Sequence, residues 1–316
     1  MLAIVRSYGR LGNQLWTYAN ILAFAKEHNI RVFHQGFDHS LFDKNQNASA
    51  PLKIWRLIDI NLRRIFINLI YRINLKVRLL PILNIGEDGL LHLDDQKNTS
   101  LLISKFKLVF LTGFYFSASK SLAKHSDYIK NFFSLNVRLQ HEVHRLIKKA
   151  RNNSEILIGV HIRHGDYRSY CDGIMYYTAE EYRDVMRAIA KDNYPTRVSF
   201  LICSDEIQDI SIFHDLDVIQ SNLKSHSIID MYALGACDYI VGPNSSFSQW
   251  ASFYGNVPLH VLNWKVAEKY GTNNVIHEPN IKRDFNCFSP ERFGEFSVKR
   301  YQLTDFYHFS HADTAN

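Results

Sequence analysis

The sequence predicts an α/β fold with two domains, and three observations support this. Short apolar segments of strand length alternate with segments of helical periodicity along most of the chain, as in proteins built on parallel sheets. The pattern restarts around residues 150–156, where the polar sequence RNNSE precedes a new apolar strand. A chain of 316 residues, 46% of them apolar, is long enough for two domains of ordinary size. We therefore expect domains at 1–150 and 151–316.

The first domain opens as strand, glycine-containing turn, helix and strand. Gly9 and Gly12 lie between an apolar strand and a segment with small and apolar residues at helical spacing. Residues 35–105 are less regular. The predicted strands are Met1–Val5, Ile30–Phe33 and Leu108–Thr112, and the predicted helices are Leu11–His28, Leu52–Leu80, Lys120–Phe133 and Val137–Ala150.

The second domain shows regular alternation typical of a doubly wound parallel sheet. Its first strand is continuously apolar, as in strands buried on both faces. The helix after it has Thr178 as N-cap and Glu181 at the capping-box position. In this domain the predicted strands are Ile156–Ile162, Arg197–Cys203, Val218–Ile219, Tyr239–Val241 and Pro258–Leu262. The predicted helices are Thr178–Lys191, Asp205–Phe213, Ser227–Ala236 and Ser246–Tyr254.

The positive charge is concentrated in one segment. The whole chain carries a net charge of +6, and residues 53–80 alone hold seven cationic side chains and a single acidic one, Asp59. This excludes a nucleic-acid surface spread over the fold. The segment has two interpretations: a peripheral contact with an anionic membrane surface, or buried helices whose Lys and Arg side chains extend to solvent.

Targeting and redox features favour a cytoplasmic protein. No apolar run reaches the length of a membrane span, and the N-terminus lacks the pattern of a signal peptide. The four cysteines form no CxxC pair, and we expect them to be free, buried thiols in a reducing compartment. The expected location is the cytoplasm, with the inner membrane face as the site of any peripheral contact.

Two motifs follow predicted strands and carry polar side chains suited to ligand binding. In GRLGNQ, residues 9–14, Asn13 and Gln14 suit sugar hydroxyls; the alternative is a tight turn whose Asn caps the helix. In HIRHGDY, residues 161–167, Arg163 suits a phosphate group, next to His161 and Asp166. The alternative there is a loop held by an ion pair between Arg163 and Asp166.

Two further motifs end later strands of the second domain. CSDE, residues 203–206, places Asp205 where nucleotide-binding sheets often accept hydrogen bonds from ribose or base; Ser204 or Asp205 could instead cap a helix. GPNSSFSQW, residues 242–250, places hydroxyls and backbone N–H groups at a helix start, which favours anions. Capping by Asn244 or Ser245 is the alternative, with Phe247 packing in the core.

Motifs of several other enzyme classes are absent. The sequence has no GxxxxGK[ST] loop, no GxGxxG after a strand, no GxSxG and no His/Cys cluster with metal spacing. The four motifs therefore suit a ligand with phosphates and hydroxyls bound without a metal. A nucleotide-sugar transferase that stabilises its leaving diphosphate with arginine and helix-terminal amides has this requirement.

Together and in order, these motifs resemble glycosyltransferase family 11, the α-1,2-fucosyltransferases. The resemblance covers residues 1–34 and 108–264. It implies a GT-B fold, in which two Rossmann-like domains face a cleft: an acceptor-side domain, 1–150, and a GDP-sugar domain, 151–316, with a C-terminal extension. It also implies inverting, metal-independent transfer from GDP-fucose, with no cofactor, to a galactose-type hydroxyl of a glycan. Another linkage, another GDP-sugar, or a non-catalytic glycan- or GDP-binding protein remain alternatives.

The resemblance also implies roles for individual residues. Arg163 would hold the pyrophosphate, with His161 and Asp205 near guanine and ribose. Asp166 would act as the base or orient Arg163, and Asp172 is a second candidate base. His164 stands where the family usually has a second arginine, which weakens the expected pyrophosphate clamp. The expected donor-side residues are His161, Arg163, Ser204, Asp205, Asn244, Ser245, Ser246 and Phe247, and the expected acceptor-side residues are Asn13, Gln14 and Tyr115.

Overall fold

The structure is a computed structural model that describes residues 1–6, 9–43, 60–85, 91–94, 105–113, 116–152, 154–270 and 286–287. Two compact units divide the chain between Asn136 and Val137. The helix that the sequence placed at the end of the first domain, α6 (Val137–Arg151), therefore groups with the second unit. The helix packs against elements of that unit, and its last residue, Arg151, donates to both carboxylate oxygens of Asp238 at 2.8 and 3.1 Å.

The first unit is built on a four-stranded parallel sheet in the order β2-β1-β5-β3. Strand β1 (Leu2–Ile4) lies between β2 (Val32–His34) and β5 (Val109–Thr112), and all three of its residues are buried. Strand β3 (Ile82–Asn84) pairs with β5 at the edge. A separate two-stranded sheet joins β4 and β6, and the bounds of these strands are Leu91–His92 and Phe116–Ser117.

Among the described helices of this unit, helix α1 (Leu11–Glu27) is the most buried, since eleven of its residues are buried. Its buried Asn20 donates to the Trp16 carbonyl and accepts from the Ala118 N–H, which joins the helix to the segment after β6. The predicted helix 120–133 is two helices, α4 (Ser119–Lys124) and α5 (Ser126–Phe132). The helices are interrupted at His125, whose ring contacts Glu27 of α1 at 2.7 Å.

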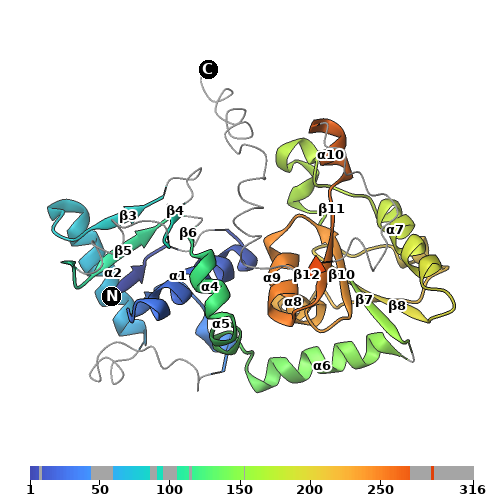
Figure 1. Ribbon diagram of the computed structural model, residues 1–316, viewed down its shortest axis with the longest axis horizontal. Coiled ribbons are helices and arrows are strands. Elements are labelled where there is room, and N and C mark those ends of the chain that lie inside the picture. The colour runs from blue at the N-terminus through green and yellow to red at the C-terminus, as the bar shows by residue number, and fades with distance from the viewer. Residues whose placement is uncertain are drawn as a thin grey trace. The chain divides into compact units, whose positions relative to one another are not determined.

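The second unit is built on a six-stranded sheet in the order β12-β11-β10-β7-β8-β9. Figure 1 labels β7, β8, β10, β11 and β12 of this sheet. All neighbours are parallel except β12. From β7 the chain first adds strands on one side and then crosses to β10 on the other, so the strand order reverses between β7 and β10. The strands are β7 (Ile156–Ile162), β8 (Val198–Ser204), β9 (Val218–Gln220), β10 (Tyr239–Pro243), β11 (Pro258–Leu262) and β12 (Asn286–Cys287).

The helices of the second unit follow the predicted alternation, with one exception. The capping box of α7 (Ala179–Asp192) is confirmed: Thr178 accepts from the Glu181 N–H, and Glu181 accepts from the Thr178 N–H. The predicted helix 205–213 is wrong, because only Ile210–Phe213 form a 3-10 turn, capped by Asp209. The other helices are α8 (Ser227–Leu234), α9 (Ser246–Gly255) and α10 (Trp264–Tyr270).

The cysteines and the helices bear on two further expectations. All four cysteines are free, as predicted, but only Cys203 and Cys237 are buried; Cys171 is partly exposed and Cys287 exposed. In the described part of the chain, no helix has the length and apolar character needed to cross a membrane.

Candidate active site at the strand ends of the second unit

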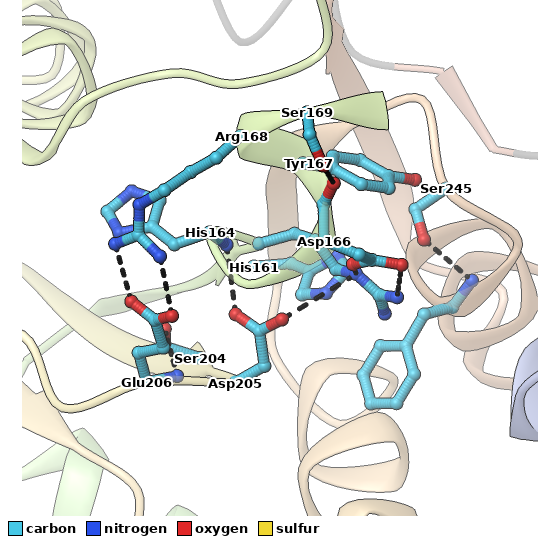
Figure 2. A network of polar contacts seen from close by, with 12 residues as sticks. His161, His164, Asp166, Tyr167, Arg168, Ser169, Ser204, Asp205, Glu206 and Ser245 are labelled. Carbon is cyan, nitrogen blue, oxygen red and sulfur yellow. Dashed lines mark hydrogen bonds and ion pairs between the residues drawn. The ribbon is translucent and has the colours of Figure 1, made fainter. Parts of the chain in front are cut away.

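Three of the predicted motifs meet at one edge of the second sheet. HIRHGDY begins with the last two residues of β7 and runs into the loop after it. CSDE ends β8, GPNSSFSQW spans the end of β10, and these three strands are neighbours. In open parallel sheets, ligands bind beyond the carboxyl ends of the strands where the strand order reverses. The reversal between β7 and β10 lies at this edge. Figure 2 shows the side chains that gather there.

Arg163 is the central cation of this edge. Its Nε and Nη2 donate to the two carboxylate oxygens of Asp166 at 2.9 and 3.0 Å, and Asp205 lies 3.7 Å from Nε. The guanidinium also lies over the Tyr167 ring, 5.1 Å from its centroid. Burial lowers the pKa of Arg163, but the hydrogen bonds and charges of its neighbours outweigh that effect and raise it. The ion pair anticipated as an alternative is therefore present.

His161 is a neutral, buried imidazole at the end of β7. Burial, and then the charge of Arg163, lower the pKa of this side chain to about 3. Its ring stacks on Phe247 with 4.8 Å between centroids, and its Nδ1 has no hydrogen-bond partner among the described residues. Gly242 makes room for it, since a Cβ there would lie 3.0 Å from the Cβ of His161. A buried polar atom without a partner is unusual and suits a site completed by a ligand.

His164 does not lie with the polar groups that surround Arg163. Its side chain is buried; Nε2 lies 2.8 Å from the Tyr177 carbonyl and Nδ1 lies 3.4 Å from the Gln208 amide. Its ring therefore holds the loop after β7 against the segment before α7. Its backbone N–H, by contrast, donates to Asp205 at 2.9 Å. This residue positions the loop.

The end of β8 carries one carboxylate beside Arg163 and several groups that form the loop. The Asp205 carboxylate lies 3.7 Å from Nε of Arg163. It also accepts from the backbone N–H of His164 (Figure 2). Ser204 is buried and accepts from the Glu206 N–H and from Gln208, so it stabilises the turn and does not cap a long helix. Glu206 binds both Nη atoms of Arg168 at 2.6 Å, and this hydrogen bonding lowers the pKa of Glu206.

The start of α9 contributes the fourth motif. Ser245, labelled in Figure 2, is the N-cap. Its Oγ accepts from the Phe247 N–H at 3.3 Å. Asn244 accepts from Gln249 through its side chain and from the Tyr167 hydroxyl through its carbonyl, at 3.5 Å. Ser246 and Phe247 are partly exposed on the first turn. Phe247 thus packs against His161 at the edge of the core and is not fully buried.

The loop after Asp166 turns sharply. Cys171, Asp172 and Gly173 all have positive φ, at 50°, 57° and 71°, a conformation that is costly for the first two residues. Tyr170, just before them, is 47% exposed and stacks on Tyr167. The side chain of Asp172 is 92% exposed and lies 3.6 Å from Lys269. This places Asp172 in solvent beside a lysine, in surroundings unlike those of Arg163.

The motif of the first unit also forms a turn before a helix. Gln14 donates to the Gly9 carbonyl at 3.0 Å, and Asn13 lies so close to Gly9 that a Cβ there would meet its amide. Gly9 has φ +69°, a conformation open to glycine. The N-cap of α1 is Arg10, without a side-chain hydrogen bond, so the alternative that Asn13 caps the helix is wrong. Both amides remain partly exposed. Tyr115 lies outside the described residues.

A match to a protein-family model identifies the family of this chain. The model described as "Glycosyl transferase family 11" matches residues 2–270. The chain belongs to glycosyl transferase family 11. The resemblance read from the sequence is thereby confirmed.

Solved structures agree on the fold of this family 11 member. A mutant of Arabidopsis thaliana FUT1 in complex with GDP is similar, with a TM-score of 0.56 and 15% identity over 83% of this chain and 70% of that chain. The fucosyltransferase NodZ from Bradyrhizobium has a TM-score of 0.50 and 16% identity over 83% and 95%. The fold is of the GT-B type. No curated protein matches the chain.

Sequence reasoning missed several residues of this site in the family 11 chain. Arg168, Glu206 and Gln208 form bonds between segments far apart in sequence, and the Tyr182 hydroxyl donates to the His161 carbonyl at 3.0 Å. No motif signals such pairings. Among the described residues, no group of three or more His, Cys, Asp or Glu side chains is placed to hold a metal ion.

Proposed function

We propose that this protein transfers fucose from GDP-fucose to a galactose-type hydroxyl of a glycan, with inversion, in α-1,2 linkage and without a metal. The observation that supports this most is the position of Arg163 at the reversal of strand order, between the ends of β8 and β10. The similar FUT1 structure is a complex with GDP and NodZ is a fucosyltransferase, which supports a GDP-sugar donor.

In this proposal Arg163 binds the pyrophosphate of the donor. A guanidinium has five N–H groups, and Asp166 takes one at Nε and one at Nη2, so the others can reach phosphate oxygens. The first turn of α9, with Ser245 and Ser246, supplies backbone N–H groups and a favourable dipole. Because His161 is neutral, it adds no charge, and its Nδ1 can accept from the base or ribose. Asp205 accepts from hydroxyl or N–H groups of the nucleoside.

The reaction is a single displacement at the anomeric carbon. The acceptor oxygen bonds to the anomeric carbon as the bond to the diphosphate oxygen breaks, GDP leaves with added negative charge, and the proton of the acceptor hydroxyl is released to water. Arg163 stabilises that charge in place of a metal ion. Asp166 is assigned the role of orienting Arg163, because both of its oxygens already accept from the guanidinium. Asn13 and Gln14, from residues 1–150, are proposed to bind acceptor hydroxyls, and the protein is proposed to act in the cytoplasm.

The first experiment titrates GDP and GDP-fucose into the protein by calorimetry in EDTA. Arg163→Ala should weaken binding by roughly 10–100-fold, the loss expected for a charge-assisted, bidentate contact. Arg187→Ala is the matched control, because Arg187 forms an ion pair with Asp215 on the exposed side of α7. Equal binding by Arg163→Ala and wild type, or binding that needs a divalent cation, would contradict the proposed site.

A second experiment tests transfer itself. The protein is incubated with GDP-fucose and a galactose-terminated oligosaccharide, and NMR of the product gives the linkage and the anomeric configuration. An α-1,2-linked product supports the proposal in full. Another linkage, or transfer only from a different GDP-sugar, would overturn the specificity. Nucleotide binding with no transfer to any acceptor would favour a non-catalytic binding protein.

A further inference from the structure

Helix α2 (Ile60–Val77) has two apolar faces: one is buried in the core of the first unit, and the side chains of the other are about half exposed. Ile67 is buried in the core of the first unit with Ala3, Phe33 and Phe110. Tyr71, one turn along the same face, contacts the Phe110 ring at 5.2 Å between centroids. This face fixes the helix to the sheet.

A second face, about a third of a turn around the helix from Ile67, is apolar and largely exposed. Leu62, Phe66, Leu69, Ile73 and Val77 are between 51% and 58% exposed, and we call these five residues the α2 stripe. Their spacing of four, three, four and four residues places them along one side of a helix. Residues 62–79 contain eight of the fourteen large apolar side chains found exposed in the described chain. Scattered exposed apolar residues are ordinary, but a continuous row indicates a binding surface.

The charges beside the stripe all have one sign. Residues 60–80 contain five Lys or Arg and no Asp or Glu. Arg64 is used internally, since its guanidinium donates to the Phe37 carbonyl at 2.8 Å. Arg72, Lys76 and Arg78 are exposed and form no ion pair with any described residue. Arg72 and Lys76 flank the stripe at helical spacing, and Arg78 follows its end.

We propose that the α2 stripe inserts into the interfacial layer of an anionic lipid bilayer, with Arg72, Lys76 and Arg78 on the lipid headgroups. An amphipathic helix with an apolar row and a basic border is suited to lie in the plane of such a surface. At 18 residues it is about 27 Å long. It is not long and apolar enough to cross a membrane. A second copy of the chain is a poorer fit, because pairing two stripes would bring basic borders together without acidic partners.

The test measures co-sedimentation of the full-length protein with vesicles, without nucleotide. Wild type should bind vesicles that contain phosphatidylglycerol, should bind phosphatidylcholine vesicles weakly, and should be released by salt. Leu69→Glu/Ile73→Glu should reduce binding by at least about tenfold. Val137→Glu/Tyr194→Glu is the matched control: it adds the same charge at exposed apolar positions, 64% and 86% accessible, in the second unit. Arg72→Gln/Lys76→Gln should weaken binding to anionic vesicles and reduce its salt dependence.

The outcomes separate the possible occupants of the stripe. Absence of vesicle binding by wild type, or an equal loss in the control, overturns the proposal. The proposal is also overturned if wild type does not bind vesicles but forms a dimer in analytical ultracentrifugation, and Leu69→Glu/Ile73→Glu dissociates that dimer. Circular dichroism melts confirm that each variant folds. This proposal does not depend on the proposed reaction. If the protein failed to bind GDP, the proposed reaction would be contradicted, but vesicle binding could still be observed.

Discussion

Within the HIRHGDY segment, two histidines three positions apart have different surroundings. His161 stacks on Phe247 with one ring nitrogen lacking a partner, whereas both ring nitrogens of His164 lie near groups of the protein itself. The difference follows from the end of β7: His161 is still in the strand, and His164 is already in the loop. Only His161 keeps an unused hydrogen-bonding atom, as a ligand-binding group requires.

Buried histidines should make the protein sensitive to acid. Burial is the main cause that lowers the pKa of His161, and of His34 in the first unit, to about 3, whereas the unfolded value is 6.5. Between these values the unfolded chain binds the proton and the folded chain does not, so stability falls as pH drops below about 6.5. Asp230 acts in the opposite direction, because burial raises the pKa of its carboxyl to about 6.

The variant His34→Phe isolates one of these groups. The loss of unfolding free energy between pH 7.5 and pH 4.5, measured by urea denaturation, should be smaller than in wild type by roughly 2–3 kcal/mol. The effect of Asp230 is the same in both proteins and cancels. His214→Gln, at an exposed histidine, should retain the wild-type pH dependence. An unchanged pH dependence in His34→Phe would show that His34 does not titrate as expected.

Among the elements, helix α9 is held where its first turn can serve the site by a close contact with the end of α8. A Cβ at Gly255, the last residue of α9, would overlap the backbone carbonyl of Gly235, and a Cβ at Gly235 would lie 2.9 Å from the Ala251 carbonyl. The two backbones thus approach more closely than side chains would allow. This contact fixes the distance from Gly235 to Ser245, ten residues before Gly255.

Gly255→Ala should therefore destabilise the protein by about 1–3 kcal/mol or more, the usual cost of overpacking. Because α9 must shift, GDP binding should weaken as well. The control is Asn256→Gly at the adjacent left-handed C-cap, φ 54°, where stability should be unchanged or slightly higher. Thermal melts and calorimetry measure both effects. A fully stable Gly255→Ala protein would show that α8 and α9 are farther apart than described.

Elements with strong local signals could be predicted from the sequence, and elements set by distant contacts could not. Strand β7 is confirmed residue for residue because its apolar run is continuous, and the start of α7 because Thr178 and Glu181 form a local capping box. The loop 205–209 was mistaken for helix because its conformation depends on Gln208 reaching Ser204 and His164. Likewise, the sequence indicates which motifs lie at strand ends. The pairing of Arg168 with Glu206 could not be predicted, because the fold brings together two residues that are far apart in the sequence.

For the whole molecule, the division into two units assigns the two proposed surfaces to different parts of the chain. The stripe of α2 belongs to the first unit and the Arg163 site to the second. Ligand binding stabilises the part of a protein that holds the ligand. Substitutions in the α2 stripe should therefore reduce vesicle binding without affecting GDP binding, and substitutions at Arg163 should do the reverse.

Hydrogen exchange tests this separation. GDP at about 100 times its dissociation constant should stabilise the second unit by about 2.7 kcal/mol. Slower amide exchange is expected mainly in peptides from β7, the end of β8 and the start of α9. Peptides from α2 should exchange at the same rate with and without GDP. Protection confined to residues 1–136 would contradict a donor site in the second unit.

The anchored helix α6 has a practical consequence for dissecting the protein. Asp238 accepts from Arg151 and also from the Leu157 N–H, so the end of α6, the start of β7 and the turn before β10 share one carboxylate. Leu139 and Ala150 are buried on the same helix. A fragment that begins at the polar stretch near residue 150 would lose helix α6, and with it most of the contacts that this helix makes with the second unit. A fragment made to test whether the second unit alone binds GDP should begin at Val137 and retain the whole of α6.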